Sequence, residues 1–157
     1  KINRNCYKKM KNSFHKLILT NDDEFIFNTL GIDFFLNPSN GLRHYYKFIK
    51  KNVKNLEGNL FDPVPNRKFD IIVCNPPYLP PAEDYDDPEL ALAVEGGPSG
   101  SEFTIRLLTQ AKDYLNSNGS IYLILSSRMK EFKVDWKRKV IKQEKFFFER
   151  LNLVHFF

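Results

Sequence analysis

The hydrophobic positions of the chain alternate between continuous runs, typical of buried strands, and spacings typical of helices. Residues 69–75, FDIIVCN, form a short apolar run of the kind found in a strand that is buried on both faces. Residues 120–127, SIYLILSS, form a second such run, and residues 146–157 predict one or two closing strands in a hairpin-like edge pair. Helices are expected at residues 43–54, 101–115 and 135–145.

Turn signals separate these elements. Residues 61–68 contain two prolines and an asparagine, a composition that predicts a turn. Residues 79–100 contain four prolines and three glycines and predict a long loop, which in a folded domain is usually functional. Ser101 is expected to cap the following helix, and Asn118-Gly119 to end it.

The order of these elements predicts an α/β fold with a mostly parallel sheet and helices on both faces. In such sheets, ligands bind beyond the carboxyl ends of the strands. The run at 69–75 stops at Pro76-Pro77, because proline cannot donate hydrogen bonds to a neighbouring strand. The segment Asn75–Tyr78 is therefore expected in the ligand crevice.

The composition indicates one folded domain. The chain has 157 residues, of which 42% are hydrophobic and 27% charged, and these proportions exclude a disordered chain. No apolar run approaches the roughly 18 residues of a transmembrane helix, and the basic N-terminal segment lacks the apolar core of a secretory signal. Cys6 and Cys74 form no paired pattern, so we expect free thiols and a cytoplasmic protein.

The net charge of +5 is unevenly distributed along the chain. Residues 1–55 contain 11 basic and 4 acidic side chains, and residues 128–157 contain 9 and 4. Residues 56–127, which include the predicted crevice, contain 4 basic and 11 acidic side chains. The acidic middle disfavours nucleic acid as the partner of that crevice, although the overall pI of 9.1 would suggest it.

The segment Asn75-Pro76-Pro77-Tyr78 has the groups needed to hold a planar nitrogen. Two consecutive prolines stiffen the backbone and leave its carbonyls free to accept hydrogen bonds. One hydrogen of a bound NH2 group would go to the Asn75 side-chain oxygen and the other to the Pro76 carbonyl. The Tyr78 ring would pack on the plane of the amide or aromatic amine. No residue of the segment is a strong base, so the chemistry would consist of positioning a weak nucleophile.

This segment resembles the NPPY motif of the amino-methyltransferases that use S-adenosylmethionine. Residues 87–92, DPELAL, and 95–100, EGGPSG, are similar to the stretches that follow this motif in the HemK-like release-factor glutamine methyltransferases. The resemblance covers residues 56–157 well and residues 1–42 poorly, within a single domain spanning residues 1–157. It implies a Rossmann-like methyltransferase fold, with Asn75, Pro76, Pro77 and Tyr78 as the catalytic segment.

The same resemblance implies a cofactor and partners. The cofactor would be S-adenosylmethionine, and the substrate would be a glutamine side chain of a peptide chain release factor. Cofactor contacts would come from Asp33, which would hold the ribose hydroxyls, from Asn59 and Leu60 near the adenine, and from Asn75. In the short branch of this family, a small zinc-binding partner protein covers an apolar edge. No metal site of this chain's own is expected, because its three histidines are dispersed.

One part of the family pattern is missing. The family binds its cofactor with a glycine-rich loop, yet this chain has no glycine before Gly31 and no G-x-G sequence. We therefore expect a fold that is incomplete on its N-terminal side. Either a strand–loop–helix unit is deleted or residues 1–40 are scrambled relative to the family; a third, less favoured explanation is a degenerate cofactor loop at residues 31–41.

Two further functions stay open from the sequence. The NPPY motif also occurs in enzymes that methylate the exocyclic amine of adenine in DNA or RNA, although this chain shows no separate target-recognition domain. The other alternative is a non-catalytic remnant that keeps the second half of the fold and binds only a partner. The sequence leaves the choice between glutamine and adenine, the integrity of the cofactor site and the oligomeric state undecided.

Overall fold

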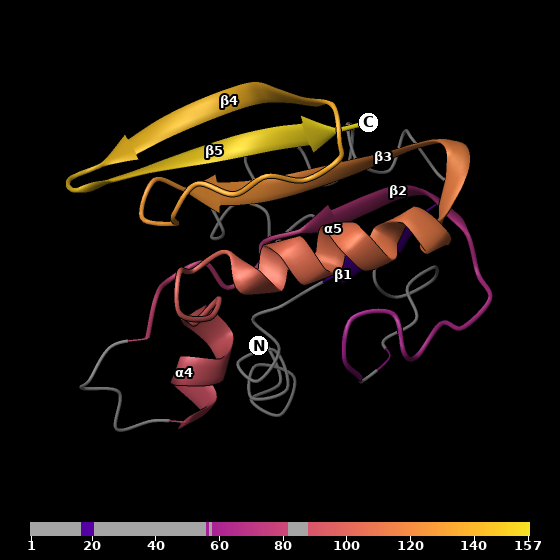
Figure 1. The fold of residues 1–157 in the computed structure, drawn as a ribbon, viewed down its shortest axis with the longest axis horizontal. Helices are drawn as coiled ribbons and strands as arrows, with labels where there is room; N and C mark the ends of the chain where they lie inside the picture. The colour runs from indigo at the N-terminus through magenta and orange to yellow at the C-terminus, as the bar shows by residue number, and fades with distance from the viewer. Residues whose placement is uncertain (1–16, 21–55, 57, 82–87) are drawn as a thin grey trace, which may run out of the picture.

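The computed structural model describes residues 17–20, 56, 58–81 and 88–157, and these form one mixed sheet with two helices (Figure 1). The five strands lie in the order β1-β2-β3-β5-β4. Their bounds are Leu17–Thr20 for β1, Phe69–Cys74 for β2, Leu115–Ser126 for β3, Arg138–Phe146 for β4 and Glu149–Phe156 for β5. The helices are α4, Pro88–Val94, and α5, Glu102–Tyr114. The helix expected at residues 43–54 lies outside the described residues.

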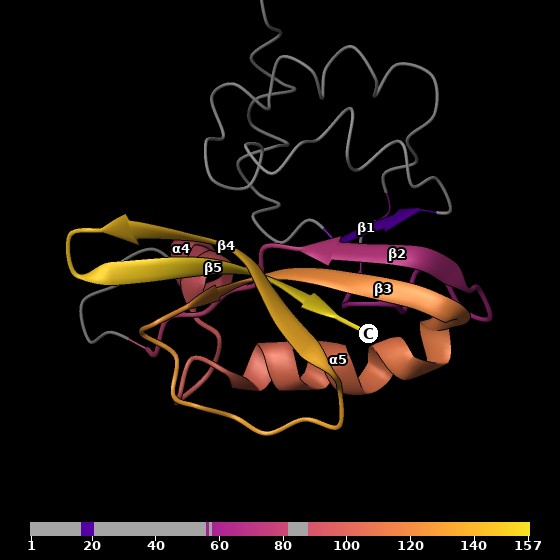
Figure 2. The same ribbon diagram turned by 90° about the horizontal axis from the view of Figure 1, so that it is seen from above.

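The centre of the fold is the β2–α5–β3 unit. Strands β2 and β3 are parallel, with Ile72 opposite Ile121 and Cys74 opposite Leu123. Helix α5 covers one face of this pair (Figure 2). Its buried side chains recur at helical spacing and meet the apolar side chains of β2 and β3 in the core: Thr104, Leu107, Leu108 and Ala111. This parallel unit with its crossover helix confirms the predicted α/β, Rossmann-like class.

The expectation of a mostly parallel sheet is corrected by the described strands, where one of the four pairings is parallel. Strand β5 inserts antiparallel beside β3, and β4 folds back on β5 as a hairpin. The helix predicted for residues 135–145 is wrong, because this segment contributes most of β4. Its Lys, Gln and Glu residues favour helices, but pairing with β5 overrides that preference. Charged side chains also suit an exposed edge strand, since they discourage pairing with other chains.

Two smaller expectations are also corrected. The long loop predicted for residues 79–100 contains the short helix α4. Asn118-Gly119 does not end α5, which already stops at Tyr114, but lies inside β3. There the register shifts, with Phe69 opposite Leu115 and Ile71 opposite Ser120. Four residues of β3 therefore face one residue of β2, and this irregularity accommodates the Asn-Gly pair.

Candidate functional site

The segment Asn75–Tyr78 begins where β2 ends, at the carboxyl end of the parallel β2–β3 pair. Asn75 is exposed, Pro76 and Pro77 are buried, and Tyr78 is half-buried. Strand β3 continues in the same direction and ends nearby at Ser126. The structure therefore places the predicted segment at the end of the sheet where ligands bind in open α/β folds.

A glycine turn at residues 96–100 packs directly on the backbone of this segment. A Cβ atom on Gly96 would lie 2.6 Å from the Pro77 carbonyl oxygen and 2.3 Å from the Gly100 carbonyl oxygen. Gly100 has a φ of +78°, and a Cβ there would lie 2.5 Å from the Tyr78 carbonyl oxygen. Only glycine permits such close approach of two backbones. The segment Asn75–Tyr78 and the glycine turn, both of which carried the family resemblance, therefore form one structural unit.

Backbone hydrogen bonds also hold this unit in place. The amides of Tyr78 and Leu79 both donate to the Val94 carbonyl, at 3.1 and 2.9 Å, and the Gly96 amide donates to the Leu79 carbonyl at 2.8 Å. The Phe103 amide, at the start of α5, donates to the Gly96 carbonyl at 2.8 Å. The segment that follows β2 is therefore held rigidly between α4 and α5.

The groups that could bind a ligand are left available by this arrangement. Among the described residues, no hydrogen bond involves the Asn75 side chain or ends on the Pro76 carbonyl. The exposed amide oxygen of Asn75 can therefore accept a hydrogen bond from a bound NH2 group. The geometry is thus suited to a planar primary amide or amine.

A second group of polar side chains, which the sequence did not point to, lies at the same end of the sheet. Ser126 is buried at the end of β3 and donates its hydroxyl hydrogen to the carboxylate of Glu149, the first residue of β5. Ser126 Oγ also accepts from the Arg128 amide at 2.9 Å. Burial raises the pKa of Tyr78 above its usual value, and the negative charge of Glu149 raises it further. The only sequence signal for this pair was a serine at the end of one apolar run and a glutamate at the start of a later one.

The structure does not bring the predicted cofactor contacts Asn59 and Leu60 next to Asn75. Their neighbour Phe61 is buried and stacks on Tyr114, the last residue of α5, with ring centroids 4.4 Å apart. Leu115, which follows, lies opposite Phe69 at the start of β2. The segment 59–61 therefore lies toward the amino end of the β2–β3 pair (Figure 1). The role of Asn59 and Leu60 stays a prediction, and Asp33 lies outside the described residues.

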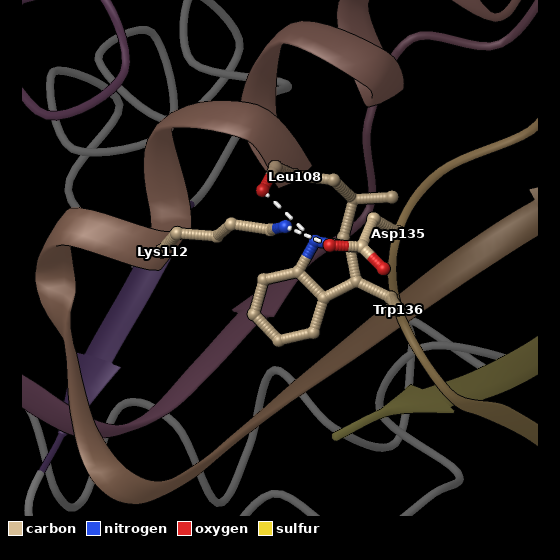
Figure 3. Close-up of polar contacts among 4 residues, drawn as sticks. All are labelled: Leu108, Lys112, Asp135 and Trp136. Carbon is tan, nitrogen blue, oxygen red and sulfur yellow. Dashed lines mark hydrogen bonds and ion pairs between the residues drawn. The ribbon is translucent and has the colours of Figure 1, made fainter.

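A cavity of about 590 Å³ opens at that amino end, away from Asn75. Beside it, the Trp136 indole N–H donates to the Leu108 carbonyl at 3.1 Å, and Lys112 forms an ion pair with Asp135 at 2.9 Å (Figure 3). The hydrogen bond from Lys112 and its positive charge hold the pKa of the Asp135 carboxyl below its usual range. These contacts fasten the connection between β3 and β4 to helix α5.

The described residues thus define an α/β protein with an exposed asparagine, followed by a rigid backbone segment, at the carboxyl end of a Rossmann-like strand pair. No family model matches the chain. Three curated relatives are a ribosomal protein uL3 glutamine methyltransferase of Bordetella pertussis and release factor glutamine methyltransferases of Geobacter sulfurreducens and Chlamydia trachomatis. They are 37%, 38% and 40% identical over 83, 69 and 82 residues respectively.

These matches cover 48%, 40% and 48% of this chain but only 27%, 24% and 28% of the three relatives. The chain therefore spans less than a third of the length of these relatives. A solved structure, the E. cuniculi Mtq2–Trm112 complex responsible for methylation of the translation termination factor eRF1, matches 82% of this chain and 79% of its own with 19% identity and a TM-score of 0.47. Over about half of its length, then, this chain is similar to protein glutamine methyltransferases.

No helix within the described ranges has the length and apolar character needed to cross a bilayer.

Proposed function

We propose that this protein transfers a methyl group from S-adenosylmethionine to the side-chain amide nitrogen of a glutamine in a peptide chain release factor. The observation that supports this most directly is the exposed Asn75 side chain, which follows β2 at the start of a rigid, buried proline pair. The similarity to glutamine methyltransferases over about half of the chain supports the same reaction.

In the proposed reaction the protein acts by positioning. One amide hydrogen of the glutamine is donated to Asn75 and the other to Pro76, while the Tyr78 ring packs on the amide plane. The cofactor supplies a methyl group on a positively charged sulfur. In the transfer, the amide nitrogen would gain the methyl group as the carbon–sulfur bond breaks, with the electron pair left on sulfur, and the amide would lose one proton to water. Holding the nitrogen in line with that bond is the main contribution to the rate.

Among the described residues, Asn75 is the one we assign to contact both amide and cofactor, because Asn59 and Leu60 lie toward the other end of the sheet. The exposed amide oxygen of Asn75 fits a group that carries positive charge, because the negative end of its carbonyl dipole can face that group. Asp33 would complete the cofactor site by accepting from ribose hydroxyls. A contact of Asn59 and Leu60 with the adenine rests on the family resemblance and would require the cofactor to extend from Asn75 toward the amino end of the sheet.

The proposal extends to the context of the reaction. We assign residues 1–157 to one methyltransferase domain, with the well-matched part at 56–157. A cytoplasmic location agrees with a release-factor substrate. A small zinc-binding activator protein is a further proposed partner, in line with the family resemblance of residues 56–157.

Mass spectrometry after incubation with a release factor and S-adenosylmethionine tests the proposal. We expect a single added methyl on one glutamine, and loss of this product by about a hundredfold or more in Asn75→Ala, since one oriented acceptor is removed. Asn118→Ala, an exposed asparagine at the other end of the sheet, is the matched control and should keep normal activity. Absence of methyl transfer to the protein would contradict the proposal, and labelling of adenine in oligonucleotides instead would favour the alternative substrate.

A further inference from the structure

The turn between β4 and β5 exposes two aromatic side chains completely. Phe147 and Phe148 connect the last residue of β4 to the first residue of β5, and their exposed fractions are 105% and 99%. Lys145 and Arg150 flank them on the two strands. We refer to residues 145–150 as the hairpin tip. Exposed aromatic side chains at one protruding point are typical of an interaction surface rather than of a stable free surface.

The hairpin tip also breaks two local rules of strand pairing. A two-residue hairpin turn with positive φ at its first residue favours glycine there, yet Phe147 occupies that position with a φ of +35°. Lys145 lies directly opposite Arg150, and like charges at paired positions repel each other. Neither feature stabilises the hairpin. Such conflicts between sequence and local structure are concentrated at functional sites.

The position of the hairpin tip relates it to the candidate site. Glu149, which belongs to the tip, binds Ser126 at the carboxyl end of β3 and raises the pKa of Tyr78. The β4–β5 hairpin extends past the carboxyl end of β3, at the end of the sheet toward which β2 also points (Figure 1). A protein bound with one side chain at Asn75 would therefore have neighbouring segments within reach of the two rings.

We infer that the hairpin tip is a docking point for the protein substrate, and that it binds an apolar segment carrying acidic side chains near the target glutamine. The occupant follows from charge complementarity: Lys145 and Arg150 flank the rings, and residues 128–157 contain 9 basic and 4 acidic side chains. Carboxylates of a bound segment would relieve the repulsion between Lys145 and Arg150, while its apolar side chains would cover the rings. This inference rests on the proposed function.

The test is the double substitution Phe147→Gly with Phe148→Asn, which removes both rings and places glycine at the turn position of positive φ, as this kind of hairpin turn favours. The melting temperature should be equal to or above that of the wild type, so misfolding cannot explain a loss of activity. With the release factor as substrate, we expect KM to rise about tenfold or more, because clustered aromatic residues contribute strongly to binding. The kcat at saturation should stay within about twofold, since the docking contact is the same in ground and transition states.

Val140→Thr is the matched control, because Val140 is 54% exposed on the same hairpin but lies far from its tip. It should leave KM unchanged. A wild type that does not methylate the release factor would overturn both the proposed function and this inference. An active wild type whose KM equals that of the double variant would overturn the inference alone. The inference would also be overturned if the wild type self-associated in sedimentation, or bound vesicles of anionic lipid, and the double variant lost that property with an unchanged KM.

Discussion

The two ends of the β2–β3 pair are built in opposite ways. At the amino end, the Trp136 indole donates to the Leu108 carbonyl and Lys112 pairs with Asp135 beside an open hollow (Figure 3). At the carboxyl end, the backbone is fixed and buried while the Asn75 side chain faces outward. The hollow at the amino end therefore does not coincide with the segment Asn75–Tyr78, which the sequence predicts as the site.

The largest expected effect comes from Gly96→Ala. The new methyl group would meet two backbone oxygens, those of Gly100 and Pro77, and neither can move without shifting the segment Asn75–Tyr78. We expect a loss of about 2–3 kcal/mol in the free energy of unfolding and a loss of activity of about a hundredfold or more, because small displacements at a positioning site are costly. Chemical denaturation and the methylation assay measure the two effects.

Gly119→Ala at the amino end is the comparison for this prediction. There the nearest atom to a new Cβ is Leu115 Cδ2, the end of a flexible side chain, at 2.7 Å. We expect a smaller loss of stability and normal methyl transfer. Equal loss of activity in both variants would show that the two ends do not differ in the way described.

Glu149→Gln is expected to have a medium effect on stability at alkaline pH. The substitution removes a charge but keeps an acceptor for Ser126. The raised pKa of Tyr78 favours its protonated form in the folded state, so this contribution to stability is present below about pH 10 and is lost as pH rises further. Without the charge of Glu149 the pKa of Tyr78 falls, while burial still holds it above its usual value. The variant should therefore lose less stability than the wild type between about pH 9 and 11.

Denaturation curves across that pH range test this prediction. Glu144→Gln serves as the control, because Glu144 pairs with Lys142 on β4, at 3.3 Å. Burial also raises the pKa of the Cys74 thiol from 9.0 to about 12, and this contribution to the alkaline loss of stability is common to all three proteins. If the curves of the two variants coincide, Glu149 does not act on Tyr78.

The smallest effect is expected from Asp135→Asn at the amino end. The Asp135 side chain is fully exposed and that of Lys112 is 46% exposed, so solvent screens their ion pair. We expect the melting temperature to change by no more than about 1 °C and methyl transfer to be unchanged. A large loss of activity would mean that the amino end takes part in the reaction.

The sequence predicted the parts of the fold that local patterns determine. The apolar runs of β2 and β3 and the helical spacing of α5 were each found where expected, and the stop at Pro76-Pro77 located the end of β2 correctly. Residues 135–145 were misread because their charged side chains suit either a helix surface or an edge strand. Only pairing with β5, a contact between distant parts of the chain, decides between the two.

Only the part of the candidate site that lies in one continuous segment could be predicted from the sequence. The segment Asn75–Tyr78 is continuous, so its chemistry is readable from the sequence. Ser126 and Glu149 are 23 residues apart and meet only because β5 inserts beside β3. The contact of Gly96 with Pro77 likewise depends on the path of the chain. Its physical basis, two backbones in close contact, cannot be read from either segment alone.

The bridge between Leu79 and Glu95 has a consequence for how this protein can change. It joins the two ends of the connection that carries residues 80–94, and the Gly96–Leu79 hydrogen bond secures the same junction. The free energy of closing a loop grows only slowly with its length. Residues can therefore be inserted between these fixed ends, or exchanged there, without displacing Asn75. Its length and sequence can vary independently of the segment Asn75–Tyr78.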